Sequence, residues 1–419
     1  MTGHAVFVVA IAIFGFALIS RRVEGSSFTP PMLFAAIGFL MASNSFGSTP
    51  FDIDHHAIQL IAEFTLIMVL FTDASRINVA KLRDSAGLPI RMLAVGLPLT
   101  MVLGALVALL IFPQYHLWEA CLLAALLAPT DAALGQSVVA SAEVPIRIRQ
   151  TINIESGLND GISLPVVLMF ATLSSAMVAQ QAMTDWLGFA ALQIGLGPVA
   201  GLVVGGLGAE LLNRAVQNRW VEDVFAGIAA LALAVMSYMF AEFIQGNGFI
   251  AAFVAGGVFG NRIKQSPDSL FRFMEGEGAL LTQITFLIFG AVLLPEAMTH
   301  AQLSHWLYAL LSLTVIRMLP IALSLWGTRL RWPSFLFLGW FGPRGLASIL
   351  FLLLIFERAS VPHADDLLTI TGITVALSIV LHGISAAPLA RKYGAYVGQN
   401  EGGTEHDESP VLPLRNGAV

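Results

Sequence analysis

The sequence has little charge and almost no cysteine. Only 11% of its 419 residues are charged, and Cys121 is the single cysteine. A soluble globular domain carries roughly 25% charged residues. One cysteine excludes an intramolecular disulfide and any metal or haem site built from several cysteines. The chain also has no run or stripe of Lys and Arg, so we expect no nucleic-acid partner.

Apolar residues dominate instead, at 57% of the chain, and the mean hydropathy is +0.79. A helix needs about 20 mostly apolar residues to cross a bilayer. The sequence therefore predicts an all-α polytopic membrane protein with the lipid bilayer as its solvent. Thirteen spans are predicted, at residues 4–20, 29–44, 57–73, 90–111, 118–140, 151–178, 187–212, 224–243, 249–260, 277–294, 304–326, 336–356 and 367–390.

The basic residues predict the orientation of these spans. All but three of the 21 Lys and Arg residues fall in the loops or tail on one side of the predicted membrane. Cytoplasmic loops carry the excess of Lys and Arg, so the N-terminus is predicted outside and the C-terminus in the cytoplasm. Of the other three, Arg358 lies on the opposite side, and Arg317 and Arg344 lie inside spans. We expect a cell-membrane protein, in the inner membrane if the source is bacterial.

Two predicted spans are interrupted near their middle, by residues 128–131 (APTD) and by residues 342–345 (GPRG). Proline removes a helical hydrogen bond, and at membrane depth the freed carbonyls need partners in protein or water. If span 187–212 is a connector, the two interrupted helices are each the fifth member of two inverted six-helix repeats. Broken helices at matching positions of inverted repeats indicate a transporter's binding site. We expect Asp131 to offset the positive helix ends and Arg344 the negative ones, with oxygens near Thr130 suited to a small cation.

Span 151–178 carries polar side chains on one helical face. Ser156, Asn159, Asp160 and Ser163 follow the spacing i, i+3, i+4 and i+7. Glu155 points elsewhere, about 140° around the helix from Asp160. An ionisable residue at membrane depth indicates a functional site by default. The sequence therefore predicts that Asp160 lines a wet ion site while Glu155 is tied to a buried cation.

Four charged residues inside spans leave alternatives open. Glu155 and Arg344 form either a structural ion pair or part of the site. Glu63 either borders a cavity or pairs with a neighbour, and Arg317 is interpreted as a structural counter-charge with a possible place at the cavity.

Three segments resemble the monovalent cation/proton antiporters of the NhaP and sodium/proton exchanger branch. They are PTDAALGQSVV (129–139), VPIRIRQTINIESGLNDG (144–161) and FGPRGLAS (341–348), and the match extends from residue 1 to about 392. The resemblance implies that Asp160 binds the cation and the proton, with Asn159 beside it. It implies that Asp131, Thr130 and Ser156 contribute to the ion site, and that Glu155 and Arg344 form the ion pair of the core. Ala132 and Gly157 depart from patterns frequent in relatives, so ion preference is not carried over.

The resemblance also implies a division of the chain. The predicted dimerisation domain of a homodimer comprises residues 1–89 and 223–303, and the predicted core transport domain comprises residues 90–178 and 304–392. A linker helix is predicted at 179–222 and a disordered cytoplasmic tail at 393–419.

The predicted function is electroneutral exchange of a monovalent cation for H⁺, with a role in pH homeostasis, no cofactor and no enzymatic activity. Na⁺ is the favoured ion, and K⁺ and Li⁺ remain alternatives. A cation channel lacks a repeated filter segment. An intramembrane hydrolase using Asp131 and Asp160 lacks supporting sequence motifs.

Overall fold

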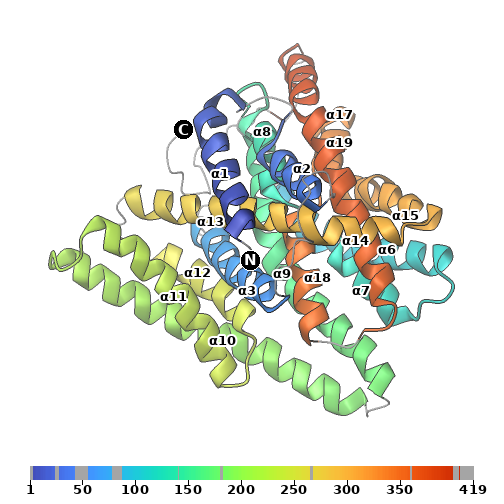
Figure 1. The fold of residues 1–419 in the computed structure, drawn as a ribbon. Helices are drawn as coiled ribbons and strands as arrows, with labels where there is room; N and C mark the ends of the chain where they lie inside the picture. The colour runs from blue at the N-terminus through green and yellow to red at the C-terminus, as the bar shows by residue number, and fades with distance from the viewer. Residues whose placement is uncertain are drawn as a thin grey trace.

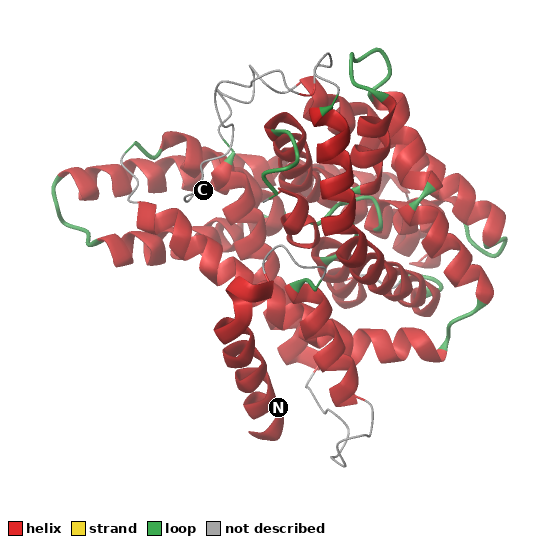
Figure 2. Ribbon diagram, turned by 90° about the horizontal axis from the view of Figure 1, so that it is seen from above, coloured by secondary structure: helices red, strands yellow, loops and turns green. Residues whose placement is uncertain are grey.

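The computed structural model describes residues 3–23, 28–42, 55–77, 87–139, 141–179, 183–264, 268–358, 361–399 and 405. Over these residues the regular secondary structure is helical (Figure 2). The first part of the chain forms α1 (Gly3–Val23), α2 (Pro30–Ala42), α3 (His55–Arg76), α5 (Gly87–Arg91), η2 (Met92–Gly96), α6 (Leu97–Ile111), α7 (Leu117–Leu126), α8 (Ala132–Val139) and α9 (Ile146–Ala179). The rest forms α10 (Met183–Gln217), α11 (Asp223–Phe243), α12 (Gly248–Arg262), α13 (Asp268–Ile288), η3 (Phe289–Leu293), α14 (Leu294–Thr299), α15 (Leu303–Leu313), α16 (Val315–Ser324), α17 (Trp332–Trp340), α18 (Leu346–Arg358) and α19 (Ala364–Gly398).

Eight segments among the described residues are long and apolar enough to cross a membrane, and shorter apolar helices lie at Pro30–Ala42, Leu117–Leu126 and Leu346–Phe356. Two of the three short helices belong to the predicted interruptions. α7 stops at Leu126 and α8 begins at Ala132, while α17 stops at Trp340 and α18 begins at Leu346. Both breaks contain a proline, which cannot donate the hydrogen bond that would continue the preceding helix.

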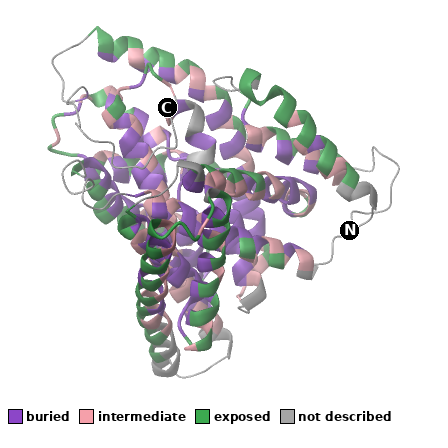
Figure 3. Ribbon diagram, turned by 90° about the vertical axis from the view of Figure 1, so that its left-hand side faces the viewer, coloured by how far each residue is buried: buried purple, intermediate pink, exposed green. Residues whose placement is uncertain are grey.

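Long apolar helices surround α9, which lies near the middle of the bundle (Figure 1). Buried residues concentrate in this central region, whereas exposed residues line the outer helices (Figure 3). Many exposed residues there are large and apolar, such as Phe14, Leu211 and Phe243. A lipid-facing surface accounts for this distribution, because no hydrophobic penalty opposes apolar exposure to hydrocarbon.

Three features differ from the sequence-based expectation. α19 continues to Gly398, beyond the start of the tail predicted at residue 393, and Glu405 is buried. The rest of the predicted tail, residues 400–404 and 406–419, lies outside the described part. The predicted span 304–326 is divided at Thr314, whose φ of −112° and ψ of −96° are not helical. The short π-helical segments η2 and η3 lie within the predicted spans 90–111 and 277–294, which were expected to be continuous α-helices.

Candidate functional site

The two interruptions meet each other. The backbone N–H of Asp131 donates a 2.8 Å hydrogen bond to the carbonyl of Pro343, which joins the two breaks directly. The carboxylate of Asp131 accepts a 2.7 Å hydrogen bond from the N–H of Leu346, the first residue of α18. Asp131 also immediately precedes α8. Its negative charge therefore lies at the positive ends of two half-helices, where it is favourable.

Free carbonyls at the C-terminal end of α7 are bound from the other broken helix. Nη1 of Arg344 donates to the carbonyls of Ala128 and Pro129, the latter at 3.0 Å. The hydroxyl of Ser348 donates to the carbonyl of Leu126 at 2.7 Å. These carbonyls would otherwise be unsatisfied at membrane depth, which costs several kcal/mol per group. Arg344 and Asp131 thus stabilise opposite ends of the crossing helices.

Two glycines of the second break make these contacts possible. A Cβ at Gly345 would overlap the carboxylate of Asp131, and a Cβ at Gly342 would overlap the guanidinium of Arg317. The spacing Gly-Pro-Arg-Gly therefore has a steric reason. Each glycine leaves room for one charged side chain to pass the backbone.

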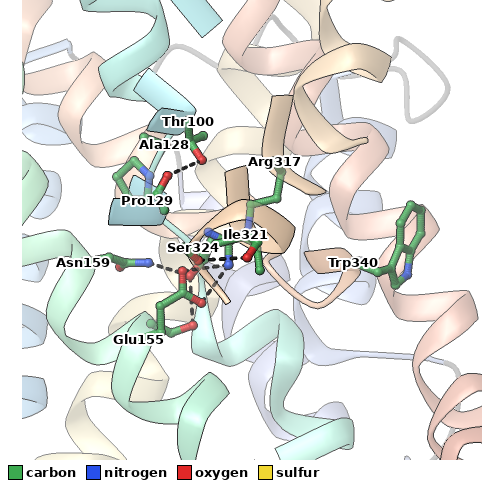
Figure 4. Close-up of polar contacts among 12 residues, drawn as sticks. Thr100, Ala128, Pro129, Glu155, Asn159, Arg317, Ile321, Ser324 and Trp340 are labelled. Carbon is green, nitrogen blue, oxygen red and sulfur yellow. Dashed lines mark hydrogen bonds and ion pairs between the residues drawn. The ribbon is translucent and has the colours of Figure 1, made fainter. Parts of the chain in front are cut away.

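Glu155 on α9 forms its ion pair with Arg317 on α16. Nη2 of Arg317 lies 2.7 Å from each carboxylate oxygen, and both side chains are at most 1% exposed. Figure 4 shows the two groups facing each other beside Pro129 and Asn159. The expected direct pairing of Glu155 with Arg344 was wrong, because Arg344 bonds the carbonyls of the first break. The charge of Arg344 still interacts with both members of the pair.

Polar side chains of α9 continue from this pair toward the first break. The Ser156 and Thr130 hydroxyl oxygens lie 3.0 Å apart, and the side-chain amide of Asn159 donates to Thr130. All three side chains are buried. The structure therefore brings Thr130, Ser156 and Asn159 together, as residues of one site should be.

Asp160 lies next to this cluster with an unsatisfied oxygen. Among the described residues, its Oδ1 is buried without a hydrogen-bond donor, as are Asn159 Oδ1 and Ser163 Oγ. Buried acceptors without donors are costly, and hard cations take such oxygen ligands. The carboxylates of Asp131 and Glu155 are close enough to interact electrostatically with Asp160. The site thus combines strong negative charge with free oxygen ligands.

A further carboxylate, Asp73 at the end of α3, interacts electrostatically with both Asp160 and Asp131. Sequence reasoning missed it, because Asp73 closes the predicted span 57–73 and acids at span ends are common. Its position in the apolar segment LFTDAS was the available signal.

Glu63, also on α3, is not part of this cluster. It accepts a hydrogen bond from the hydroxyl of Tyr238. It borders a cavity of about 10 Å³ between α3 and α18, which is lined by Gln59, Leu350 and Leu354 among others. The pairing with a neighbour that the sequence offered is thus present, whereas this small cavity contains no residue of the ion cluster.

A larger cavity of about 440 Å³ lies between α3, α9 and α12. Its mostly apolar wall includes Ala74, Leu158 and Phe253, and it also includes the polar residues Asn261 and Arg262. Leu158 is two residues from Asp160, and Phe253 packs against Gly161. Residues two apart on a helix point in nearly opposite directions, so the cavity borders α9 on the face away from Asp160, at the end of α12 that carries Arg262.

Crossing broken helices with buried charges, inside a bundle of apolar helices, define the class of polytopic membrane proteins that bind substrates near the bilayer midplane. The family "Sodium/hydrogen exchanger, transmembrane" matches residues 8–392, and the chain belongs to this family of transporters.

The sequence identity to individual relatives is low. The K(+)/H(+) antiporter NhaP2 of Shewanella oneidensis is 25% identical over 366 residues, 86% of this chain and 62% of that protein. The K(+)/H(+) antiporter NhaP of Alkalimonas amylolytica is 27% identical over 379 residues, 89% of this chain and 63% of the relative. The chain thus spans less than two thirds of these relatives. The structure of the sodium proton antiporter MjNhaP1 from Methanocaldococcus jannaschii at pH 8 superposes with a TM-score of 0.74 at 18% identity, covering 93% of this chain and 99% of that one, which shows a shared fold.

Proposed function

We propose that the protein exchanges a monovalent cation for protons across a cell membrane. The observation that carries the proposal is the buried, unsatisfied Oδ1 of Asp160 among other oxygens and carboxylates. In its ionised form Asp160 binds the cation together with oxygens of Thr130, Ser156, Asn159 and the Asp131 region. Protonation of Asp160 removes its charge and releases the cation, so cation and proton compete for one group.

Asp131 and Glu155 have other roles in this proposal. Asp131 bonds the start of α18, and Glu155 is paired with Arg317. Both remain ionised and leave Asp160 as the group that exchanges its proton. One proton then replaces one cation and exchange is electroneutral. A pH difference of one unit sustains about a tenfold cation gradient.

Access to the site is proposed from the end of α12 that carries Arg262, where the cavity of about 440 Å³ borders α9. Arg262 at this cavity belongs to the side that the basic loops assign to the cytoplasm. The cavity is then the cytoplasmic entrance. Movement of the core against the scaffold closes it and opens the outer side, in the alternating-access manner of inverted-repeat transporters.

The full architecture is proposed as thirteen spans in two inverted six-helix repeats, with the N-terminus outside and the C-terminus in the cytoplasm. The core comprises the spans within 90–178 and 304–392, and a homodimer forms through 1–89 and 223–303. Packing of α3 with α11, α12 and α13 supports one scaffold unit. Native mass measurement in mild detergent that finds monomer at every concentration would contradict the dimer.

Na⁺ is the favoured cation, and a K⁺/H⁺ antiporter is the second candidate because the two similar NhaP proteins carry that name. Transport of Na⁺, Li⁺ and K⁺ by purified protein in proteoliposomes, across a range of pH, distinguishes them. Asp160→Asn removes the titrating group with little change in size and should abolish exchange. Asp365→Asn, which changes an exposed acid at the start of α19, is the matched control.

Voltage provides the second arm of this test. Moving one net charge would couple transport to voltage by about 2.3 kcal/mol per 100 mV, whereas one-for-one exchange has no such dependence. The flux reversal point should therefore stay constant when the membrane potential is clamped at different values. A marked shift, or normal exchange by Asp160→Asn, would refute the mechanism.

A further inference from the structure

α19 (Ala364–Gly398) lies beside α17 and α18, which flank the second break (Figure 1). It presents a line of polar side chains to the break. Ser378, His382 and Ser385 follow the spacing i, i+4 and i+7, which places them on one face of the helix. Ser378 and His382 are at most 1% exposed. Ser385 is half-buried. None of the three belongs to the ion site described above, so the burial of Ser378 and His382 at membrane depth requires a separate explanation.

His382 and Ser378 bind the backbone on both sides of the break. Nε2 of His382 lies 2.9 Å from the carbonyl of Trp340, the last residue of α17. A carbonyl only accepts, so Nε2 carries the hydrogen. The hydroxyl of Ser378 accepts a 2.7 Å hydrogen bond from the backbone N–H of Arg344. These two contacts fix the start and the end of the segment between α17 and α18.

The two α19 side chains also bond each other. Nδ1 of His382 lies 3.1 Å from Ser378 Oγ and 3.0 Å from the Ser378 carbonyl. In the neutral ring with its hydrogen on Nε2, Nδ1 accepts from the Ser378 hydroxyl. The resulting chain of hydrogen bonds runs from the Arg344 N–H through the Ser378 hydroxyl and the His382 ring to the Trp340 carbonyl. A ring protonated at both nitrogens would donate from Nδ1 to the Ser378 carbonyl instead. In either state Nε2–H donates to the Trp340 carbonyl, and this is the contact that holds the end of α17.

The third member holds the side chain of Trp340. The indole N–H donates a 2.9 Å hydrogen bond to Ser385 Oγ, and the indole packs against the His382 ring with centroids 4.8 Å apart and planes tilted by 30°. The end of α17 is thus held through both its backbone and its last side chain.

This contact network continues into the ion site. The side chain of Arg344 bonds the carbonyls of Ala128 and Pro129, and the carbonyl of Pro343 accepts from the N–H of Asp131. A displacement of residues 340–344 would therefore displace the backbone on either side of Thr130. Arg344 links α19 to the first break. Its backbone N–H bonds Ser378, and its side chain bonds the carbonyls of Ala128 and Pro129.

We propose that Ser378, His382 and Ser385 form an α19 clamp whose hydrogen bonds position the crossing of the two broken helices for cation binding. The clamp residues do not touch the cation; they act through Arg344 and the 341–345 segment. The inference rests on the proposed exchange function and adds positioning residues to it. A merely structural clamp would alter stability and yield, whereas a positioning clamp also alters the apparent KM for the cation.

The test compares a variant that removes the Nε2–H donor of His382 with a variant that restores a donor at this position. His382→Met keeps a side chain of similar length but removes both ring nitrogens, and His382→Gln restores an N–H donor. Cation-driven proton flux in proteoliposomes should show a KM raised about tenfold in His382→Met, with most of the loss recovered in His382→Gln. Flux is normalised to folded protein, so that a lower yield does not alter KM.

A second pair of variants keeps the proposal testable if His382→Met does not fold. Ser378→Ala deletes the acceptor of the Arg344 N–H. Thr374→Val, the control, deletes a buried hydroxyl on the same helix. This hydroxyl donates a 2.7 Å hydrogen bond to the carbonyl of Ile370, one turn earlier in α19. Ser378→Ala should raise KM several-fold and Thr374→Val should leave it unchanged.

An unchanged KM in Ser378→Ala, or equal KM values in His382→Met and His382→Gln, would overturn the clamp. Absence of cation-dependent proton flux in the wild-type protein would instead refute the proposed exchange. The two failures are therefore distinguishable.

Discussion

Arg317 binds Glu155 across two helices that are far apart in the sequence, with one guanidinium nitrogen 2.7 Å from each carboxylate oxygen. Thr314 interrupts the helix just before Arg317, so α15 and α16 are separate segments, and Gly342 leaves space for the guanidinium. The buried charge of α9 is thereby compensated without using Arg344, which remains available to bind the first break.

Removing this partner should destabilise the protein strongly. Arg317→Ala leaves Glu155 buried without a counter-ion, which costs roughly 3–5 kcal/mol. We expect a lower melting temperature in detergent and a reduced yield, with the exposed Arg329→Ala as the control. A double-mutant cycle should give a larger coupling energy for Glu155 with Arg317 than for Glu155 with Arg344. A wild-type melting temperature for Arg317→Ala would contradict the assigned pairing.

A side chain at position 345 should disturb the contact between Asp131 and α18. Gly345→Ala places a Cβ where the Asp131 carboxylate lies, and such overpacking costs typically 1–3 kcal/mol. We expect both slower exchange and lower thermal stability. Gly276→Ala is the control, because nothing lies within 4 Å of a Cβ there and alanine favours the helix by about 1 kcal/mol. Equal activity and stability of the two variants would rule out a steric role for Gly345.

Asp73 should strengthen cation binding through its charge. Asp73→Asn removes one of the carboxylates that interact electrostatically with Asp160, and a loss of about 1.4 kcal/mol corresponds to a tenfold change in affinity. We expect the KM for the cation to rise by up to about tenfold, while Asp160 still exchanges its proton. Asp73→Glu retains the charge and should lie closer to the wild type. If Asp73→Asn kept the wild-type KM at every pH, the carboxylate would have no part in cation binding.

Glu405 should stabilise the protein only while it is ionised. It accepts hydrogen bonds from the Arg331 N–H at 2.8 Å and the Ser334 hydroxyl at 2.9 Å at the start of α17. Burial alone raises the pKa of Glu405, but these hydrogen bonds and the charge of Arg331 outweigh it and hold the pKa below its usual 4.5. A lowered folded-state pKa means that the stabilisation is complete above about pH 4.5 and is lost as the pH falls through the folded-state pKa.

Glu405→Gln should therefore melt at a lower temperature than the wild type at pH 7, and the difference should shrink below about pH 4.5. Thermal melting of both proteins from pH 7 down to about pH 3 measures this, with the exposed Glu143→Gln as the control. A constant difference across that range would show that the carboxylate charge is not responsible.

The sequence alone determined the class of the protein and the places where its central helices break. Low charge and long apolar runs leave little choice but membrane-spanning helices, and Pro129 and Pro343 predict both interruptions because proline cannot continue the hydrogen-bond ladder. The spacing of Ser156, Asn159 and Asp160 predicts one polar face of α9, since helical periodicity is a local property.

Only the tertiary structure decided which groups on different helices meet. Arg317 and Arg344 were both candidates for Glu155, and spacing along the chain cannot rank partners on distant spans. Arg317 pairs with Glu155 because α16 begins after the break at Thr314 and because Gly342 has no side chain that would overlap the Arg317 guanidinium. Asp73 and His382 joined the centre in the same way, through helix packing that brings α3 and α19 to the crossing. Local rules specify where helices form and break, whereas the pairing of buried charges depends on the three-dimensional packing of the whole chain.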